Sequence, residues 1–465
     1  MRKRISIIAL ICCLLLTSIG MYGCAKSDKT TKPNDTVTNT ETTDSNKENT
    51  AEEKEFEISV PSTEEKQIST LEGTFSNIIN DYNTENKTNY KLKFTSAQGK
   101  DITNTRMSSN DKPDIFILDS PADVAQYVKQ DLLLDITSYA EQGQWNNTLF
   151  DWAYNLSKVK DKVFTLPYGY EGIVLWYNKD IMSKLGLTAE DIDTEAEFEN
   201  AMKLAQDNGY TPIMLGTQDW PWAQEWYLSV MLSYTGRGLV KDALQGNNGI
   251  KWTDDAFNKT IETYKNWHEK GYLADGKSYV LTSDDAINAF TNDKALFKLE
   301  GTWATYWITP LDQEQKDKIG VMLHPAINDT ETSHLPIAVG GMWCVSKDTE
   351  APDLAGYILN KLLTQDIQSD FLAAGLDVAP MAIDSSEFKS LDPVVQNMWM
   401  LLNDALNKGD YGYTTYAFYP PETRVYIYEG IVNVLENNIS IQDYLTQIQS
   451  LTEKEREAGA IPFLP

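Results

Sequence analysis

The stretch at residues 166–180, LPYGYEGIVLWYNKD, decides the interpretation of the whole chain. It turns at a Gly-Tyr-Glu-Gly corner and continues into the apolar run 173–177. A run of β-branched and aromatic residues that is closed by Asn-Lys-Asp predicts a strand ending in a turn. Glu171, between two conformationally free glycines, is either an exposed acid of a plain turn or an acid that faces a cleft. The local sequence leaves both interpretations open.

The composition of the chain favours an exported, acidic, globular protein. It has 465 residues, of which 42% are hydrophobic and 12 are tryptophan, enough for two or three domain-sized units. Its formal net charge of −28 disfavours nucleic acid and anionic lipid headgroups as partners of its surface. Residues 1–23 predict an export signal, because three basic residues precede an apolar region that is too short for a good membrane span.

Cysteine usage agrees with export and indicates a lipid anchor. The residues before Cys24 resemble a bacterial lipobox, so we expect a signal peptide at residues 1–23 and lipidation of Cys24. An ordinary signal peptide followed by a chance cysteine is the alternative. Residues 24–55 are polar and predict a disordered tether. Cys344 is then the remaining cysteine of the globular part, which excludes an intramolecular disulfide and a cysteine metal cluster.

Strands and helices alternate where the globular part begins. The predicted elements are strands at 56–60 and 90–94, a helix at 64–82 and a buried strand within 112–121. Such alternation predicts an α/β lobe with a largely parallel sheet, whose ligands sit beyond the carboxyl ends of the strands. Asp119 and Ser120 end the buried strand and are therefore candidate ligand contacts. Helix capping before Pro121 is the alternative for both.

Three tryptophans lie within seven residues around a proline, next to several polar side chains. Flat rings stack on the apolar faces of sugar rings, and neighbouring polar groups bind the hydroxyls. We expect Trp220 and Trp222 to face a ligand cleft and Trp226 to begin a buried helix.

Several motifs, taken in order, resemble a known family. The pattern P-x3-E-x5-Y-N-K-D at residues 167–180 resembles the first inter-lobe crossing of extracellular solute-binding proteins. More narrowly, it resembles the maltose-binding-protein-like group, or family 1, that serves ATP-binding-cassette importers. Residues 286–303 resemble a second signature of this group. The resemblance implies that Glu171, with the neighbouring Tyr170, contacts a ligand hydroxyl and that Trp303 stacks on the ligand.

The resemblance also implies a fold class and a division into lobes. The expected fold is α/β and two-lobed, of the periplasmic-binding-protein-like type II class, with a ligand cleft between the lobes and three crossings. Beyond the first motif, the crossings are expected at residues 319–325 and near residues 381–384. The expected N-terminal lobe comprises residues 56–168 and 323–382, and the C-terminal lobe residues 169–322 and 383–465.

Two more residues are candidates for the cleft. Trp343 follows a glycine pair in the strand that is expected to return to the first lobe. Arg424 ends an aromatic segment, residues 411–424, that either lines the cleft or packs against the second lobe.

The expected function is binding without catalysis. A carbohydrate, expected to be an oligosaccharide, is held between the lobes, and the closed form delivers it to a membrane permease coupled to an ATPase. No cofactor and no metal are expected. The protein is expected to be a monomer on the outer face of the cytoplasmic membrane, which it touches through the N-terminal lipid alone.

Two other classes stay open as alternatives. A secreted glycoside hydrolase needs a pair of carboxylates, but 68 acidic residues make such a pair easy to nominate. The chain has neither an H-E-x-x-H nor a G-x-S-x-G motif, and it has three histidines. A scaffold or adhesin lipoprotein is the third class, and it predicts no affinity for a small molecule.

Overall fold

The computed structural model describes residues 52–61, 65–96, 100–109, 111–218, 222–327, 335–384, 386–461 and 464. Cys24 and the predicted signal peptide lie outside these residues, as do Trp220 and the side chain of Trp222. Among the helices that are described, none has the length and apolar character needed to cross a membrane.

The first sheet has five strands in the order β2-β1-β3-β12-β6. β1 runs parallel to β2 and β3, whereas β12 is antiparallel to β3 and β6. All residues of β3 are buried, which explains its continuous apolar sequence, because inner strands of such a sheet are covered on both faces. The strands are β1 (Lys54–Val60), β2 (Tyr90–Ser96), β3 (Ile115–Leu118), β6 (Thr165–Pro167) and β12 (Met342–Val345).

The second sheet follows the order β13-β11-β7-β9-β8, with β10 also paired to β7. Its strands are β7 (Tyr170–Asn178), β8 (Thr211–Met214), β9 (Ala295–Gly301), β10 (Ile319–Met322), β11 (Leu335–Val339) and β13 (Tyr411–Tyr413). The strand that the sequence predicts at residues 173–177 is confirmed, since it lies inside β7. Its polar end is a helix cap, because Oδ1 of Asn178 accepts a 2.9 Å hydrogen bond from the N–H of Ile181 in α7 (Lys179–Lys184).

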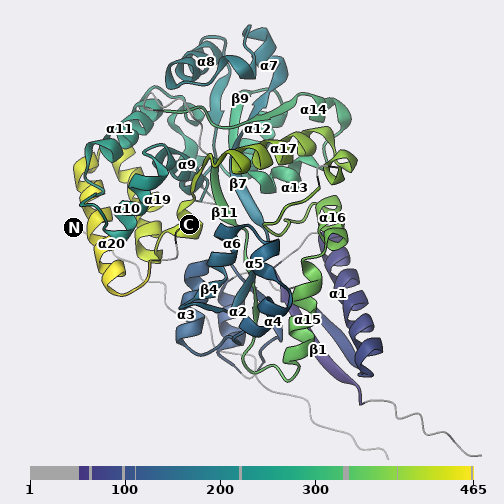
Figure 1. The fold of residues 1–465 in the computed structure, drawn as a ribbon. Helices are drawn as coiled ribbons and strands as arrows, with labels where there is room; N and C mark the ends of the chain where they lie inside the picture. Colours follow the sequence, from purple (N-terminus) through teal and green to yellow (C-terminus); the bar gives the residue numbers. More distant parts are fainter. Residues whose placement is uncertain are drawn as a thin grey trace, which may run out of the picture. The chain divides into compact units, whose positions relative to one another are not determined.

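Helices cover the sheets. In Figure 1, α1 (Glu65–Asn86), in purple, lies beside α15 (Pro352–Leu362) and α16 (Gln365–Ala374), in green, although the sequence separates them widely. The apolar side of the predicted helix at 64–82 is confirmed, because Leu71, Phe75, Ile78 and Ile79 of α1 are buried. α8 (Glu195–Asp207), α9 (Trp222–Ser233) and α12 (Ser283–Thr291) pack against strands of the second sheet.

The remaining elements connect or flank these layers. In the first part of the chain they are α2 (Lys100–Met107), α3 (Pro121–Lys129), α4 (Thr137–Gln142), α5 (Trp145–Thr148), α6 (Asp151–Leu156), and the two-stranded ribbon β4 (Lys158–Val159) and β5 (Lys162–Val163). Further along are α10 (Arg237–Gln245), α11 (Asp255–Glu269), α13 (Thr305–Ile308), α14 (Gln313–Asp317), α17 (Pro393–Lys408), α18 (Thr415–Phe418), α19 (Pro421–Leu435) and α20 (Ile441–Glu457). Short 3₁₀ turns are η1 (Ala189–Asp191), η2 (Ala274–Gly276), η3 (Ser278–Val280), η4 (Thr302–Ala304) and η5 (Glu387–Ser390).

The chain passes between the sheets at definite points. It leaves the first sheet after β6 and enters the second at β7, as the motif at residues 167–180 predicts. The second crossing predicted at residues 319–325 is wrong, because β10 and then β11 still pair with β7. The return to the first sheet takes place at Gly340 and Gly341, between β11 and β12. Gly341 has a φ of +147°, and a Cβ there would lie 2.9 Å from Ile117 Cγ2, so a glycine is needed.

The pairing of the strands can also be compared with the expected boundaries of the lobes. β11 is hydrogen-bonded into the second sheet, although the sequence placed residues 323–382 in the first lobe. Later in the chain, Met381 forms a bridge to Leu149, and α17 packs against β10 of the second sheet. The third connection therefore lies between residue 381 and α17, close to the expected residues 381–384.

Candidate functional site

Segments that connect the two sheets lie side by side. The backbone N–H of Gly340 donates a 3.0 Å hydrogen bond to the carbonyl of Gly169, which joins the second crossing to the first. The N–H of Tyr170 donates to the carbonyl of Val378, also at 3.0 Å. Two pairs of residues, one about 170 and the other about 210 positions apart in the chain, therefore meet at the junction of the two sheets.

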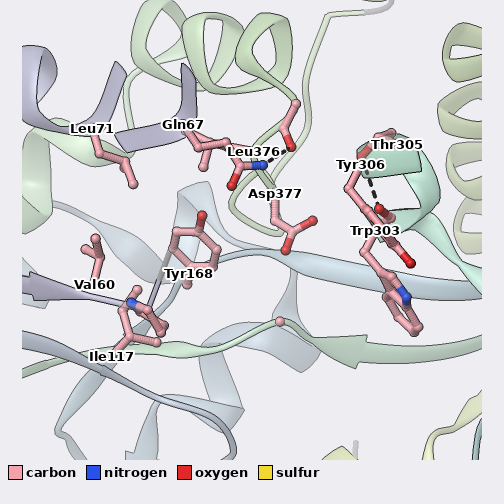
Figure 2. Close-up of a pocket in the computed structure, with 13 residues that line it drawn as sticks. Val60, Gln67, Leu71, Ile117, Tyr168, Trp303, Thr305, Tyr306, Leu376 and Asp377 are labelled. Carbon is pink, nitrogen blue, oxygen red and sulfur yellow. Dashed lines mark hydrogen bonds between the residues drawn. The ribbon is translucent and has the colours of Figure 1, made fainter. Parts of the chain in front are cut away.

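A cavity of about 330 Å³ lies at this junction (Figure 2). Small-molecule sites commonly have volumes of roughly 300–1,000 Å³. Ile117 and Tyr168 line the cavity from the side of the first sheet, and Trp303 and Tyr306 line it from the side of the second. Asp377 adds a carboxyl group to the lining of the cavity. The cavity thus combines aromatic faces with an acid.

The end of β9 positions the aromatic residues of the second side. β9 ends at Gly301, and the two short turns η4 and α13 then carry Trp303 and Tyr306. The hydroxyl of Thr302 accepts a 3.4 Å hydrogen bond from the N–H of Gly172, which ties this turn to β7. The ring of Trp303 lies 4.9 Å from that of Trp226 between centroids, so one ring face or edge has a packed neighbour. Trp303 is half-buried, as a ring that also meets a cavity should be.

Glu171 and Asp377 converge on one point beside the cavity. A Cβ at Gly340 would lie 2.5 Å from Oε1 of Glu171 and 2.8 Å from Oδ2 of Asp377. A Cβ at Gly169 would meet the Cβ of Asp377 as well. Both crossings therefore carry a glycine where the two acids approach, and any side chain there would push the carboxyl groups away.

The two acids share an environment that disfavours negative charge. Burial raises the pKa of Glu171 and of Asp377 above their ordinary values, and the charge of Asp377 raises that of Glu171 further. Opposing this, the hydroxyl of Tyr416 donates a 3.1 Å hydrogen bond to Oε2 of Glu171 and stabilises its charged form. Tyr416 comes from α18, so the aromatic segment near the C-terminus reaches the first crossing.

Arg424 anchors α18 through a hydrogen bond to its backbone. Its Nε donates to Oε1 of the fully buried Glu225 at 2.8 Å, and its Nη1 donates to the carbonyl of Tyr416 at 3.4 Å. The hydroxyl of Thr415 donates to the same Oε1 of Glu225 at 3.0 Å. Arg424 does not line the cavity described above. The structure thus favours packing against the second sheet, one of the two alternatives that the sequence left open.

Two other predicted ligand contacts, Asp119 and Ser120, lie just before α3. Ser120 is buried and caps α3, accepting from the N–H of Asp123 at 3.3 Å, while Asp119 is exposed beside it. Neither lines the cavity. Helix capping therefore accounts for Ser120. For both residues, ligand contact stays a prediction.

Two predicted contacts are core residues. Trp343 is 1% exposed, and its ring packs edge-on against Tyr168 and Phe75 at centroid distances of 5.3 and 5.6 Å. Tyr170 is fully buried, and its hydroxyl donates to Oδ1 of Asn403 at 3.3 Å. Trp343 thus supports the wall residue Tyr168, whereas direct ligand contact by either residue stays a prediction. Trp220 and the side chain of Trp222 lie outside the described residues, so their exposure also stays a prediction.

Sequence reasoning missed several residues of the site. Asp377 lies between Gly375 and Pro380, in a turn that carries no sequence signal of a binding site. Tyr168 lies inside the motif at residues 167–180, and Tyr416 lies in the aromatic segment 411–424. The proximity of Asp377 and Tyr416 to Glu171 depends on chain segments 200 residues or more away, and no local pattern announces it.

Comparisons with known proteins find a family and a set of relatives to which this chain is similar. A family model described as bacterial extracellular solute-binding protein matches residues 69–369, which is more than half of the chain. The multiple sugar-binding protein of Streptococcus mutans is 27% identical over 296 residues, which are 60% of this chain and 65% of that protein. The maltodextrin-binding protein MdxE of Bacillus subtilis is 27% identical over 205 residues, 42% of this chain and 45% of that protein.

The chain thus spans between about half and two thirds of the length of these relatives. Among solved structures, a chitin oligosaccharide binding protein superimposes with a TM-score of 0.70 at 19% identity. That match covers 86% of this chain and 98% of the other. The likeness establishes the two-lobed α/β fold that the sequence predicted.

Proposed function

The chain belongs to the family of bacterial extracellular solute-binding proteins, and from this premise we propose that it captures a carbohydrate and delivers it to the permease of an ATP-binding-cassette importer. The observation that carries the proposal is the cavity at the junction of the two sheets, which both Trp303 and Asp377 line. Aromatic rings stack on the apolar faces of sugar rings, and carboxylates accept hydrogen bonds from hydroxyls. Relatives named for sugar and maltodextrin binding support the ligand class.

Capture in this proposal is a matter of differential affinity. A ligand that contacts both sides of the junction stabilises the arrangement in which both sides meet it. Three connecting segments between the sheets provide the places where the backbone changes direction. The protein itself carries out no chemistry on the ligand.

The proposed location is the outer face of the cytoplasmic membrane. We infer that residues 1–23 direct export, that Cys24 is lipidated and that the polar residues after it act as a tether. Incorporation of labelled palmitate into the full chain, and its loss in Cys24→Ser, tests this part. Palmitate retained in Cys24→Ser, or a wild-type chain that is never labelled, would contradict it.

A ligand screen tests the binding proposal. The purified protein is heated with neutral mono- and oligosaccharides, and its melting temperature is recorded. A ligand at 100 times its dissociation constant stabilises the folded state by about 2.7 kcal/mol, which such a scan detects. The shift should disappear in Trp303→Ala and persist in Met400→Ala, a control at an exposed position of α17. If no saccharide raises the melting temperature, the carbohydrate proposal is contradicted.

A hydrolase is the second candidate, because two carboxyl groups with raised pKa converge beside the cavity. Glycoside hydrolysis by the usual mechanism needs one acid and one carboxylate flanking the scissile bond. The same bound saccharides, incubated with the protein and analysed for new reducing ends, separate the two functions. Release of product that stops in Asp377→Asn would establish the enzyme, whereas affinity without turnover supports the binder.

A further inference from the structure

The cavity wall contains an acid whose carboxyl group faces open space. Asp377 lines the cavity, and Figure 2 shows its carboxyl group between Tyr168 and Trp303. Glu171 approaches the same point from the first crossing, as the positions around Gly340 show. The two acids come from segments about 200 residues apart, so the fold itself brings them together.

The protein offers these acids little positive charge. Among the described residues that line the cavity there is no lysine, arginine or histidine. The guanidinium of Arg424 is bound to Glu225 and to the carbonyl of Tyr416, and Nζ of Lys66 donates to the carbonyl of Ala373 at 2.7 Å. Among the described residues, the groups that shift the pKa of Glu171 are Asp377 and Tyr416, and neither is a cation. The charge of Asp377, which raises the pKa of Glu171, therefore has no cationic partner among the described residues that line the cavity.

We propose that Asp377 is a specificity-determining residue that, together with Glu171, makes the cavity select saccharides that present hydrogen-bond donors and reject those that carry a carboxylate or phosphate. The proposal rests on the proposed function and names its substrate class: neutral and amino saccharides. An ionised carboxylate can only accept hydrogen bonds, so hydroxyl and ammonium groups match it. A like charge placed against it is repelled, and a half-buried site screens that repulsion poorly.

The selection acts through exclusion as well as attraction. A ligand carboxylate near Asp377 would bring a further negative charge to a site that already disfavours it, whereas a ligand ammonium would favour the charged forms of the two acids. The expected order of affinity within one sugar series is amino, then neutral, then uronic. The step from neutral to uronic is expected to be tenfold or more.

Matched sugars and matched variants test the proposal. Glucose, glucosamine and glucuronic acid, the galactose counterparts of all three, and their short oligomers are titrated calorimetrically into the purified full chain at pH 7.5. In each series that binds, the dissociation constant of the uronic member should exceed that of the neutral member at least tenfold. Asp377→Asn, which keeps the shape of the side chain, should shrink this ratio at least threefold.

The control is Asp370→Asn, which removes the same charge from an exposed position of α16 and should leave the ratio unchanged. Glu171→Gln is a second variant, expected to shrink the ratio in the same direction, should Asp377→Asn fold poorly.

Each result has a definite meaning. A neutral-to-uronic ratio below tenfold, or a ratio that neither variant changes, overturns the selectivity and leaves the carbohydrate-binding proposal standing. A ratio that Asp370→Asn changes as much as Asp377→Asn does also overturns it, since net charge would then explain the effect. Absence of binding in every series overturns the proposed function and this inference with it.

Discussion

The guanidinium of Arg424 and the carboxylate of Glu225 form a 2.8 Å ion pair in which the glutamate is fully buried. The pair joins α19 to α9 and also reaches the backbone of Tyr416, whose hydroxyl donates to Glu171. A charged network thus runs from the inside of the second sheet to the first crossing. Arg424 supports the site through this network and does not line the cavity.

Replacing Arg424 should destabilise the protein severely. Arg424→Met leaves the Glu225 carboxylate buried without its cation, which typically costs about 3–5 kcal/mol. Denaturant unfolding measures the loss, and the double variant Arg424→Met/Glu225→Gln should recover part of it. Lys408→Met is the control, because its pair with Asp404 is exposed and its loss should leave the stability nearly unchanged. Similar losses in Arg424→Met and Lys408→Met would refute the role of the buried pair.

Gly340→Ala should disturb both acids at once. The new Cβ would lie 2.5 Å from Glu171 Oε1 and 2.8 Å from Asp377 Oδ2, so one carboxyl group at least must move. We expect a loss of about 1–3 kcal/mol in stability, as for other overpacked sites, and weaker saccharide binding. Gly238→Ala, in helix α10 with nothing within 4 Å, should be neutral or stabilising. An unchanged affinity in Gly340→Ala would show that the position of the two acids is unimportant for the ligand.

Two tryptophans that the sequence treated alike should behave differently. Trp343 is buried against Phe75 and Tyr168, so Trp343→Ala should cost about 3–5 kcal/mol of stability. Trp303 is half-buried at the cavity, so Trp303→Ala should lower saccharide affinity about tenfold or more, a change of ~1.4 kcal/mol. Its effect on stability should be the smaller of the two. Calorimetry and thermal unfolding of both variants give the comparison, and the opposite pattern would reverse the assignments.

The acid pair of Glu171 and Asp377 should make stability depend on pH. The folded-state pKa of Glu171 and of Asp377 is raised above the ordinary values of 4.5 and 3.8. Between the unfolded and the folded pKa values, the folded protein therefore binds more protons than the unfolded chain. The stabilising contribution is therefore complete below the unfolded pKa values and is lost as pH rises through the raised ones. A pKa that is higher by one in the folded state corresponds to about 1.4 kcal/mol.

Unfolding free energies at pH 5 and pH 8 test this dependence. Relative to Glu171→Gln/Asp377→Asn, the wild-type protein should lose at least about 1 kcal/mol between the two values, because a pKa raised by one in a single acid already accounts for that amount. The comparison with the variant removes the contribution of all other titrating groups. A wild-type protein that gains stability against the variant over this interval would contradict the raised pKa values.

Local sequence was sufficient wherever structure depends on neighbouring residues. The apolar run 173–177 became β7, because β-branched and aromatic residues suit a strand covered on both faces. The spacing of Leu71, Phe75, Ile78 and Ile79 became the buried side of α1. The order of several loose motifs identified the family and the two-lobed fold, since a match of many weak signals in sequence is more specific than any one of them.

The site depended on contacts that no local pattern records. Sequence motifs identified Glu171 and Trp303 as candidate ligand contacts but did not identify Asp377. They also predicted the second crossing before β11, whereas it follows β11. Strand pairing decides that crossing, because β10 and β11 both find hydrogen-bond partners on β7 and remain in the second sheet. Likewise, Trp343 is in the core because the α1 residue Phe75 packs against it.

Composition, helical and strand periodicity, and motif order thus established the fold class and the type of residue that a sugar site needs. Which acids and rings share one cavity was settled by tertiary packing, since Glu171, Trp303, Asp377 and Tyr416 come together only when both crossings have formed. Side-chain proximity over about 200 residues of chain is a property of the folded backbone, and glycines at positions 169 and 340 are what allow it here.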